Sequence, residues 1–145
     1  MSEAMEDKDS PQLKERLKSL GFEATQFEPK VNNRFIVKAD GLPSYVVKGI
    51  KLPKYCSNSN ITSYIELECY NPLALKFEQT AIDFVKQPEV KIKVQILDPL
   101  ANVDTTWDIV GVKGEVDFGA LNWSNEGEAN IVYITFEVKN FTVSY

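Results

Sequence analysis

Histidine is absent from this chain of 145 residues. Without it, no Ser-His or Cys-His nucleophile pair can form and no imidazole can bind a metal, so most hydrolase templates fail. Cysteine is scarce: Cys56 and Cys69 are too far apart for a CxxC pair, and we expect both thiols to be reduced. Long apolar runs are also missing, which argues against a transmembrane helix of about 20 residues.

Basic residues are in the minority, with 16 Lys and Arg against 21 Asp and Glu and a net charge of -5. This balance argues against a protein that grips nucleic acid through its phosphates. The acidic start, MSEAMEDKDS, contains no apolar signal-peptide core, so we expect folding in a cytoplasm. The Asn-x-Ser/Thr triplets at Asn60, Asn122 and Asn140 are accordingly expected to carry no glycan.

Alternating apolar residues near the C-terminal end predict a long strand. In IVYITFEV, the residues Val132, Ile134, Phe136 and Val138 share one face, which is typical of a half-buried strand. Beyond Lys139 and Asn140 the apolar phase moves by one residue, to Phe141, Val143 and Tyr145. We therefore predict a bulge or a sharp bend near Asn140.

Further segments have strand or helix patterns. Residues 34–39 and 45–52 predict two strands joined as a hairpin through Asp40-Gly41. Residues 61–70 and 90–96 alternate as strands, and residues 107–118 predict one strand or two, interrupted at Gly111 and Gly114. Between them, Asn71-Pro72 opens a helix to about residue 86, whose apolar face contains Leu73, Phe77, Ile82, Phe84 and Val85.

This order predicts a mainly β (α+β) fold, a β-sandwich or partial barrel with one flanking helix. Residues 31–145 would form this domain. Residues 1–30 would form an N-terminal arm with a short helix that Ser10 caps, with Pro11 in its first turn and Gly21 at its end.

The stretch from the predicted helix to the end resembles the tail-tube proteins of contractile-tailed bacteriophages. The resemblance depends on the order of an alternating strand ending in LDPL, Trp107-x-Ile109, Val116-x-Phe118-Gly119, Leu121-x-Trp123-Ser124 and a final alternating strand. The segment NRFIVKADGLPSYVVKGIKLP also resembles the N-terminal strand pair of tube-like virion proteins.

The resemblance implies a virion structural protein that catalyses no reaction and needs no cofactor or metal. Such proteins self-assemble in the host cytoplasm into hexameric rings whose sheets join into one large barrel. The stacked rings form the tail tube, a conduit for DNA during genome ejection, and partners include sheath, baseplate and tape-measure proteins. Alternatives are a baseplate or tail-terminal protein of the same fold, the tube of a contractile injection machine, or a monomeric β-sandwich binding module.

In such a barrel one strand face packs under the helix and the other lines the lumen. An acidic lumen repels DNA phosphates, although an ordinary solvated face explains the same pattern. The lumen candidates are Glu66, Glu68, Glu115, Asp117 and Glu137. The candidates for contacts between subunits are Tyr45, Val47, Trp123 and Tyr145.

Two chemical alternatives use carboxylates. Glu66 and Glu68 stand about 7 Å apart along one strand face, a separation that inverting glycosidases use. Asp98, Asn102 and Asp104 cluster hard oxygen ligands in one loop, but without EF-hand spacing. Both patterns are commoner as a solvated strand face and a polar turn, and no Gly-rich phosphate loop precedes the predicted helix at residues 71–86.

Overall fold

Strands dominate the computed structural model, which describes residues 29–58, 62–124 and 126–145. All regular elements of this part of the chain lie in the compact unit Arg34–Tyr145. The N-terminal helix predicted from Ser10 to Gly21 lies outside the described residues. In chain order the elements are β1 (Phe35–Ala39), the 3-10 helix η2 (Ser44–Val46), β2 (Val47–Lys51), β3 (Tyr64–Tyr70), α3 (Phe77–Lys86), β4 (Val90–Leu97), β5 (Val103–Asp117) and β6 (Ile131–Ser144).

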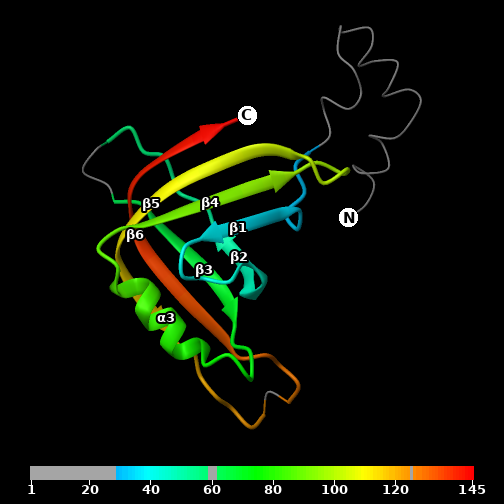
Figure 1. The fold of residues 1–145 in the computed structure, drawn as a ribbon, viewed down its shortest axis with the longest axis vertical. Helices are drawn as coiled ribbons and strands as arrows, with labels where there is room; N and C mark the ends of the chain where they lie inside the picture. The colour runs from blue at the N-terminus through cyan, green and yellow to red at the C-terminus, as the bar shows by residue number, and fades with distance from the viewer. Residues whose placement is uncertain (1–28, 59–61, 125) are drawn as a thin grey trace, which may run out of the picture. The chain divides into compact units, whose positions relative to one another are not determined.

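The six strands form one antiparallel sheet in the order β1-β4-β5-β6-β3-β2. The long strands β5 and β6 run through its centre (Figure 1). The first half of β5 pairs with β4, whereas the first half of β6 pairs with β3. The sheet therefore curls into a nearly closed, barrel-like form, which confirms the predicted mainly β partial barrel with a flanking helix.

The predicted hairpin between residues 34–39 and 45–52 is wrong. β1 pairs with β4 and β2 pairs with β3, so the two strands occupy opposite ends of the sheet order. The connection between them contains Leu42 and Val46, both buried. Asp40-Gly41 does form a tight turn, in which the Leu42 N–H donates to the Ala39 carbonyl at 3.2 Å. Beyond this turn the chain buries Leu42 and Val46 in the core and leads to β3, so β2 does not return along β1.

The predicted bulge in β6 is confirmed at Lys139. Val138 pairs with Gly111 and Asn140 pairs with Val110, which leaves Lys139 as the extra residue. The bulge restores the apolar phase, because Phe141 returns to the core side and stacks on Trp107 with ring centroids 5.5 Å apart. A single inserted residue thus keeps a 14-residue strand amphipathic along its whole length.

Residues 107–117 belong to one strand, not two, and Phe118 follows its end. β5 runs without a break from Val103 to Asp117 and has a bulge at Lys113, whose φ of 54° is left-handed. A Cβ atom on Gly114 would lie 2.5 Å from Phe136 Cε1 and 2.8 Å from Val85 Cβ. Glycine is needed there because the helix and the Phe136 ring approach the strand backbone.

Helix α3 is shorter than predicted. It begins at Phe77 instead of residue 71, after Lys76 in a left-handed conformation, and Leu73 is fully exposed. The helix buries Phe77, Ala81 and Phe84 against the sheet, and the Phe84 ring meets Phe136 edge-on at 5.4 Å. Asn71-Pro72 begins a loop instead. Leu73 and Leu75, which follow it, are exposed to solvent, so a helix over these residues would bury no apolar face.

Both cysteines are free thiols, and Cys69 is buried in the core. No helix among the described residues is long and apolar enough to cross a membrane.

Candidate functional site

The five lumen candidates share one surface of the sheet. On β3, Ile65 and Leu67 point into the core, so Glu66 and Glu68 point outward. The same alternation turns Glu115 and Asp117 of β5 and Glu137 of β6 outward. We call this surface, formed by Glu66, Glu68, Glu115, Asp117 and Glu137, the carboxylate face.

Register arranges these carboxylates in rows across three strands. Thr135 of β6 has Glu66 on one side and Glu115 on the other. Tyr133 likewise lies between Glu68 and Asp117. Two strand spacings, about 10 Å, separate the carboxylates of a row. This spacing lets the negative charges share one face with limited repulsion, because water screens exposed charges at that distance.

Lysines border the carboxylate face without neutralising it. Lys113, at the β5 bulge, approaches Glu137 with Nζ and Oε2 3.5 Å apart. Lys51 of β2 lies beside Glu66 in the strand register. The face is thus a band of carboxylates with cations at its margins.

A second outward surface has three lysines beside Asp40 and Asp108. Lys38 of β1 lies directly beside Lys93 of β4, and Lys93 is 3.9 Å from the carboxylate of Asp108. Together with Lys91 these side chains line an open groove of about 610 Å³ across β1, β4 and the first half of β5. We call this surface the lysine groove. The alternation of residues 90–96 predicted that Lys91 and Lys93 face outward. The presence of Lys38 beside them depends on the pairing of β1 with β4.

The contact candidates do not come together in the subunit. Tyr45 lies in η2 and is 72% exposed, whereas Val47, at the start of edge strand β2, is half-buried. Trp123, in the loop between β5 and β6, is 98% exposed, and Tyr145 beyond the end of β6 is 94% exposed. Tyr45 and Val47 are near neighbours in the chain, whereas Trp123 and Tyr145 belong to other segments, so the four candidates do not form one patch.

The carboxylate of Asp98, one of the predicted oxygen ligands, stabilises a turn. The carboxylate of Asp98 accepts the backbone N–H groups of Leu100 and Asn102, both at 2.9 Å. The hydroxyl of Thr105 donates to the carboxylate of Asp104. Within the described residues no group of three or more Cys, Asp and Glu side chains gathers in a geometry suited to a metal ion.

The bulge of β6 also contains an ion pair. The sequence predicted the position of this bulge but not the residue that pairs with its lysine. Lys139 at the β6 bulge bonds Glu89 in the turn between α3 and β4. This hydrogen bond and the lysine charge lower the pKa of Glu89. The pair links the helix end to the bend of β6, a contact between residues 50 positions apart that no local pattern reveals.

Known structures provide the comparison, since no protein-family model and no curated protein matches the chain. The fold is similar to a chain in the sheath-tube complex of an extracellular contractile injection system, PVC, in its extended state. That match has a TM-score of 0.61 at 10% identity over 83% of this chain and 94% of the other. A chain of the PVC sheath/tube terminator gives 0.61 at 11% identity, covering 81% and 98%.

The anti-feeding prophage cap, described as a tube-terminating cap, contains a third similar chain. Its TM-score is 0.53 at 13% identity, covering 81% of this chain and 91% of that one. At these identities the likeness establishes a shared fold.

Proposed function

We propose that this protein is a structural subunit of a phage tail tube or of the tube of a related contractile injection machine. The observation that supports this most is the shared fold with a chain of the PVC sheath-tube complex, which extends over nearly all of that chain. The subunit would assemble into hexameric rings, and the rings would stack into a conduit. Its partners would be copies of itself, sheath, baseplate and tape-measure proteins.

The carboxylate face is the proposed lumen wall. Its five acidic side chains lie on the outward side of β3, β6 and the second half of β5. These strands and β2 form one half of the sheet, with the core and α3 behind them. A wall of this charge repels the phosphates of DNA in transit and limits sticking.

Edge strands supply the means of ring closure. β1 and β2 each have a strand partner on one side only among the described residues. An edge with unpaired N–H and C=O groups tends to pair with another chain. In a closed ring, pairing between neighbours satisfies these groups and converts an aggregation hazard into assembly.

A terminator or cap role is a closely related candidate, because chains in the PVC terminator and the anti-feeding prophage cap share the fold. Such a subunit would form a ring that ends a tube instead of extending it. A baseplate subunit would likewise differ from a tube subunit in which rings lie above and below it.

Mass photometry with negative-stain microscopy across a concentration series tests the proposal. We expect species of six subunits and hollow rings or tubes of uniform diameter. A monomer at every concentration would contradict it and favour a β-sandwich binding module. A Glu66→Gln, Glu68→Gln variant addresses the enzyme alternative, since loss of a hydrolytic activity with assembly unchanged would support a glycosidase-like pair.

A further inference from the structure

The two edge strands of the sheet differ in regularity. β1 pairs with β4 through five consecutive residues without a shift of register. β2 pairs with β3 through a bulge, because Val47 and Gly49 lie opposite the consecutive residues Cys69 and Glu68, which leaves Lys48 as the extra residue. Beyond the bulge, three residues of β2 remain in regular pairing.

The bulge limits what a second strand can bind on the open side of β2. A strand from another molecule adds to a sheet edge through a regular ladder of N–H and C=O groups. A bulge disrupts this ladder, bends the strand and increases its twist. A straight strand can therefore match the three residues that follow Lys48, which is a short ladder for stable pairing.

Charge and proline add to the effect of the bulge. Lys48 and Lys51 of β2 are exposed, and burial of an ammonium group beneath an added strand costs free energy. Pro53, two residues after β2, has no N–H to donate, so it interrupts any longer ladder. Bulges, lysines and prolines are the means by which natural sheets keep edge strands from pairing. β2 combines all three, whereas β1 has one lysine, Lys38, in an unbroken register.

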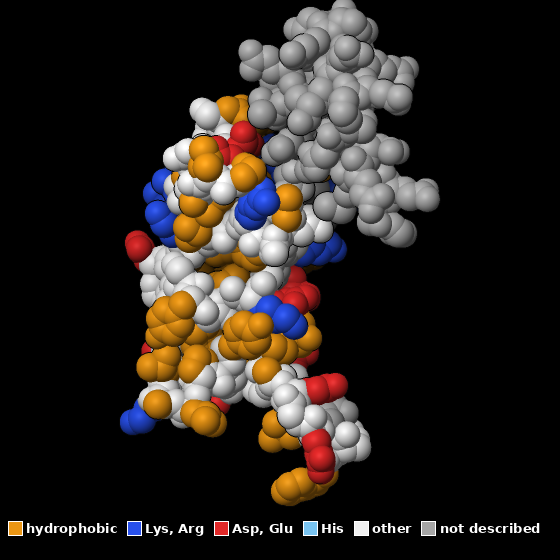
Figure 2. Space-filling view, turned by 90° about the vertical axis from the view of Figure 1, so that its right-hand side faces the viewer, with side chains coloured by type: hydrophobic (Ala, Val, Ile, Leu, Met, Phe, Trp, Pro, Cys, Tyr) orange, Lys and Arg blue, Asp and Glu red, His pale blue; other side chains and the backbone are white. Residues whose placement is uncertain are grey.

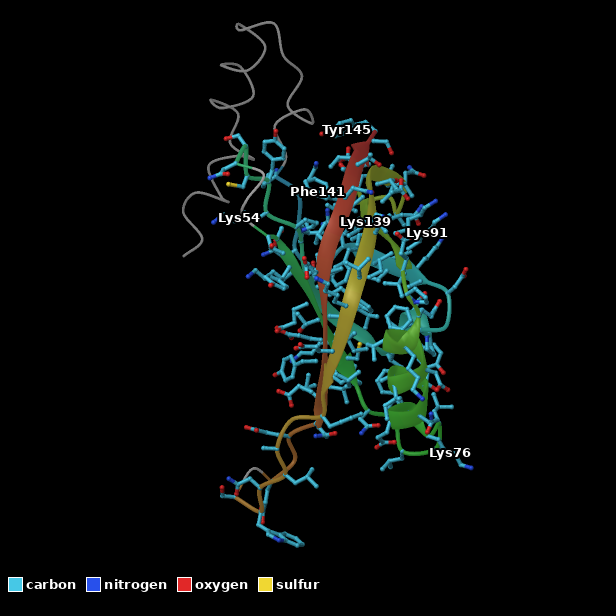
Figure 3. All side chains as sticks on the ribbon, turned by 90° about the vertical axis from the view of Figure 1, so that its left-hand side faces the viewer. Lys54, Lys76, Lys91, Lys139, Phe141 and Tyr145 are labelled. Carbon is cyan, nitrogen blue, oxygen red and sulfur yellow. The ribbon has the colours of Figure 1, made fainter. Side chains whose placement is uncertain are left out.

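The lysines of β2 are separate from the lysine groove. Lys54, which follows Pro53, lies on one side of the strand pair β5 and β6, and Lys91 of the groove lies on the other (Figure 3). The Lys54 N–H donates to the Ser63 hydroxyl at 2.9 Å, which fastens the chain beside the start of β3. The charges on this edge therefore need an explanation of their own.

The surface contains groups that favour association. Apolar side chains are exposed over parts of the face shown in Figure 2. Tyr45, in η2 directly before β2, is 72% exposed. An unprotected edge strand beside exposed apolar groups is a predicted aggregation site, so protection of β2 would have a clear use.

We propose that the bulge and the lysine at position 48 protect the β2 edge, and that they raise the protein concentration at which copies of this chain associate through it. The consequence for ring assembly rests on the proposed function, in which edge strands pair between neighbouring subunits. Two free subunits would then seldom pair through β2, whereas a closing ring forms several contacts together and compensates for the short ladder. The protection itself does not depend on the form of the assembly.

Two variants remove the protection in different ways. Deletion of Lys48 removes both the charge and the bulge, and it leaves a regular alternation in which Val47 and Ile50 contact the core and Gly49 lies between them. Lys48→Thr removes the charge alone. The control, Lys86→Thr, removes an exposed lysine of α3. Sedimentation velocity across a concentration series gives the concentration at which half of the protein is associated, and circular dichroism checks folding.

We expect the deletion to lower this concentration by about tenfold, the effect of one or two regained backbone hydrogen bonds. Lys48→Thr should lower it by a smaller factor. Loss of a lysine makes the net charge of -5 more negative, so repulsion between whole molecules predicts a rise in every variant. The control should therefore show no fall.

A fall in neither variant, or an equal fall in the control, would overturn the inference and leave the proposed function intact. If the deletion variant does not fold, the result for Lys48→Thr decides. An unmodified protein that stays monomeric at every concentration would instead overturn the proposed function. In that case association of either variant would still support the protection of β2, and monomers of both would overturn it.

Discussion

Gly114 lies where helix α3 and the Phe136 ring both approach the backbone of β5. Any side chain there meets Phe136 and Val85 at distances that Cβ atoms do not tolerate. Both partners belong to the densely packed region around the Phe84–Phe136 ring pair, which has little freedom to yield. A residue with a Cβ at this position would therefore force α3 or the Phe136 ring to shift.

Replacement of Gly114 by Ala should lower the free energy of unfolding by about 1–3 kcal/mol, the usual cost of overpacking a core. Urea denaturation followed by circular dichroism measures the change. The matched control is Gly49→Ala, where the nearest atom to the new Cβ is the flexible Glu68 Oε2 at 3.6 Å. Equal denaturation midpoints for the two variants would show that the helix does not pack as described.

The two thiols should differ in reactivity. Burial raises the pKa of Cys69 to about 12, so almost none of this thiol is ionised at pH 8, and the thiolate is the reactive form. Cys56 is only half-buried. We expect a thiol-reactive dye to label one cysteine per native chain and two after unfolding, and equally fast labelling of both native thiols would contradict the burial of Cys69.

At the scale of elements, bulges decide the direction in which the long strands face. Lys139 offsets the phase change between Val138 and Phe141, so that both contact the core cluster. Its removal joins Val138 to Asn140 and leaves the alternation of core and solvent residues intact. Removal of a residue within the regular part of the strand instead turns every later side chain to the other face.

Deletion of Lys139 should therefore be tolerated better than deletion of Thr135, although it removes a bend and the ion pair with Glu89. The Thr135 deletion is the matched control, because it shortens the same strand by one residue. We expect the Lys139 deletion to melt cooperatively and the Thr135 deletion to be insoluble or unfolded. Similar stability of the two proteins in thermal melts would contradict the assigned phase.

Local pattern predicted the strands well and their partners poorly. The alternation in residues 61–70, 90–96 and 131–138 located three strands, and the phase change located the bulge at Lys139. The predicted hairpin failed because the nearness of β1 and β2 in the chain does not determine pairing when Leu42 and Val46 fill the core. The helix start at Asn71-Pro72 failed because Leu73 was counted as a core residue although it faces solvent.

At the scale of the whole molecule, the carboxylates of β3, β5 and β6 gather on one surface of the described sheet. Sequence alternation predicted each carboxylate to face water, but only the order β3-β6-β5 shows that all five share one face. The pairing of Lys38 with Lys93 likewise depends on a contact between distant segments. Candidate residues were thus predictable one by one, whereas the surfaces they form required the strand order.

If the carboxylate face lines the proposed conduit, reversal of its charge should make the rings bind DNA. Rings with Glu66→Lys and Glu68→Lys should retain DNA at low salt and release it as salt rises, because new lysines bind phosphates by displacing counterions. The control, Glu78→Lys and Asp83→Lys, makes the same change of charge on exposed positions of α3. The measurement is the amount of DNA that each variant retains on a filter across a salt series. Equal retention by the two variants would place the carboxylate face away from the lumen.

The most direct test of the central claim is a cryo-electron microscopy map of the assembled protein. We predict six-fold rings in which the outward side of β3, β6 and the second half of β5 lines a central channel, with Glu66 and Glu115 directed toward the axis. A ring with α3 or the lysine groove on its channel wall would contradict the assignment of the lumen. Particles without a channel would contradict the tube-subunit account itself.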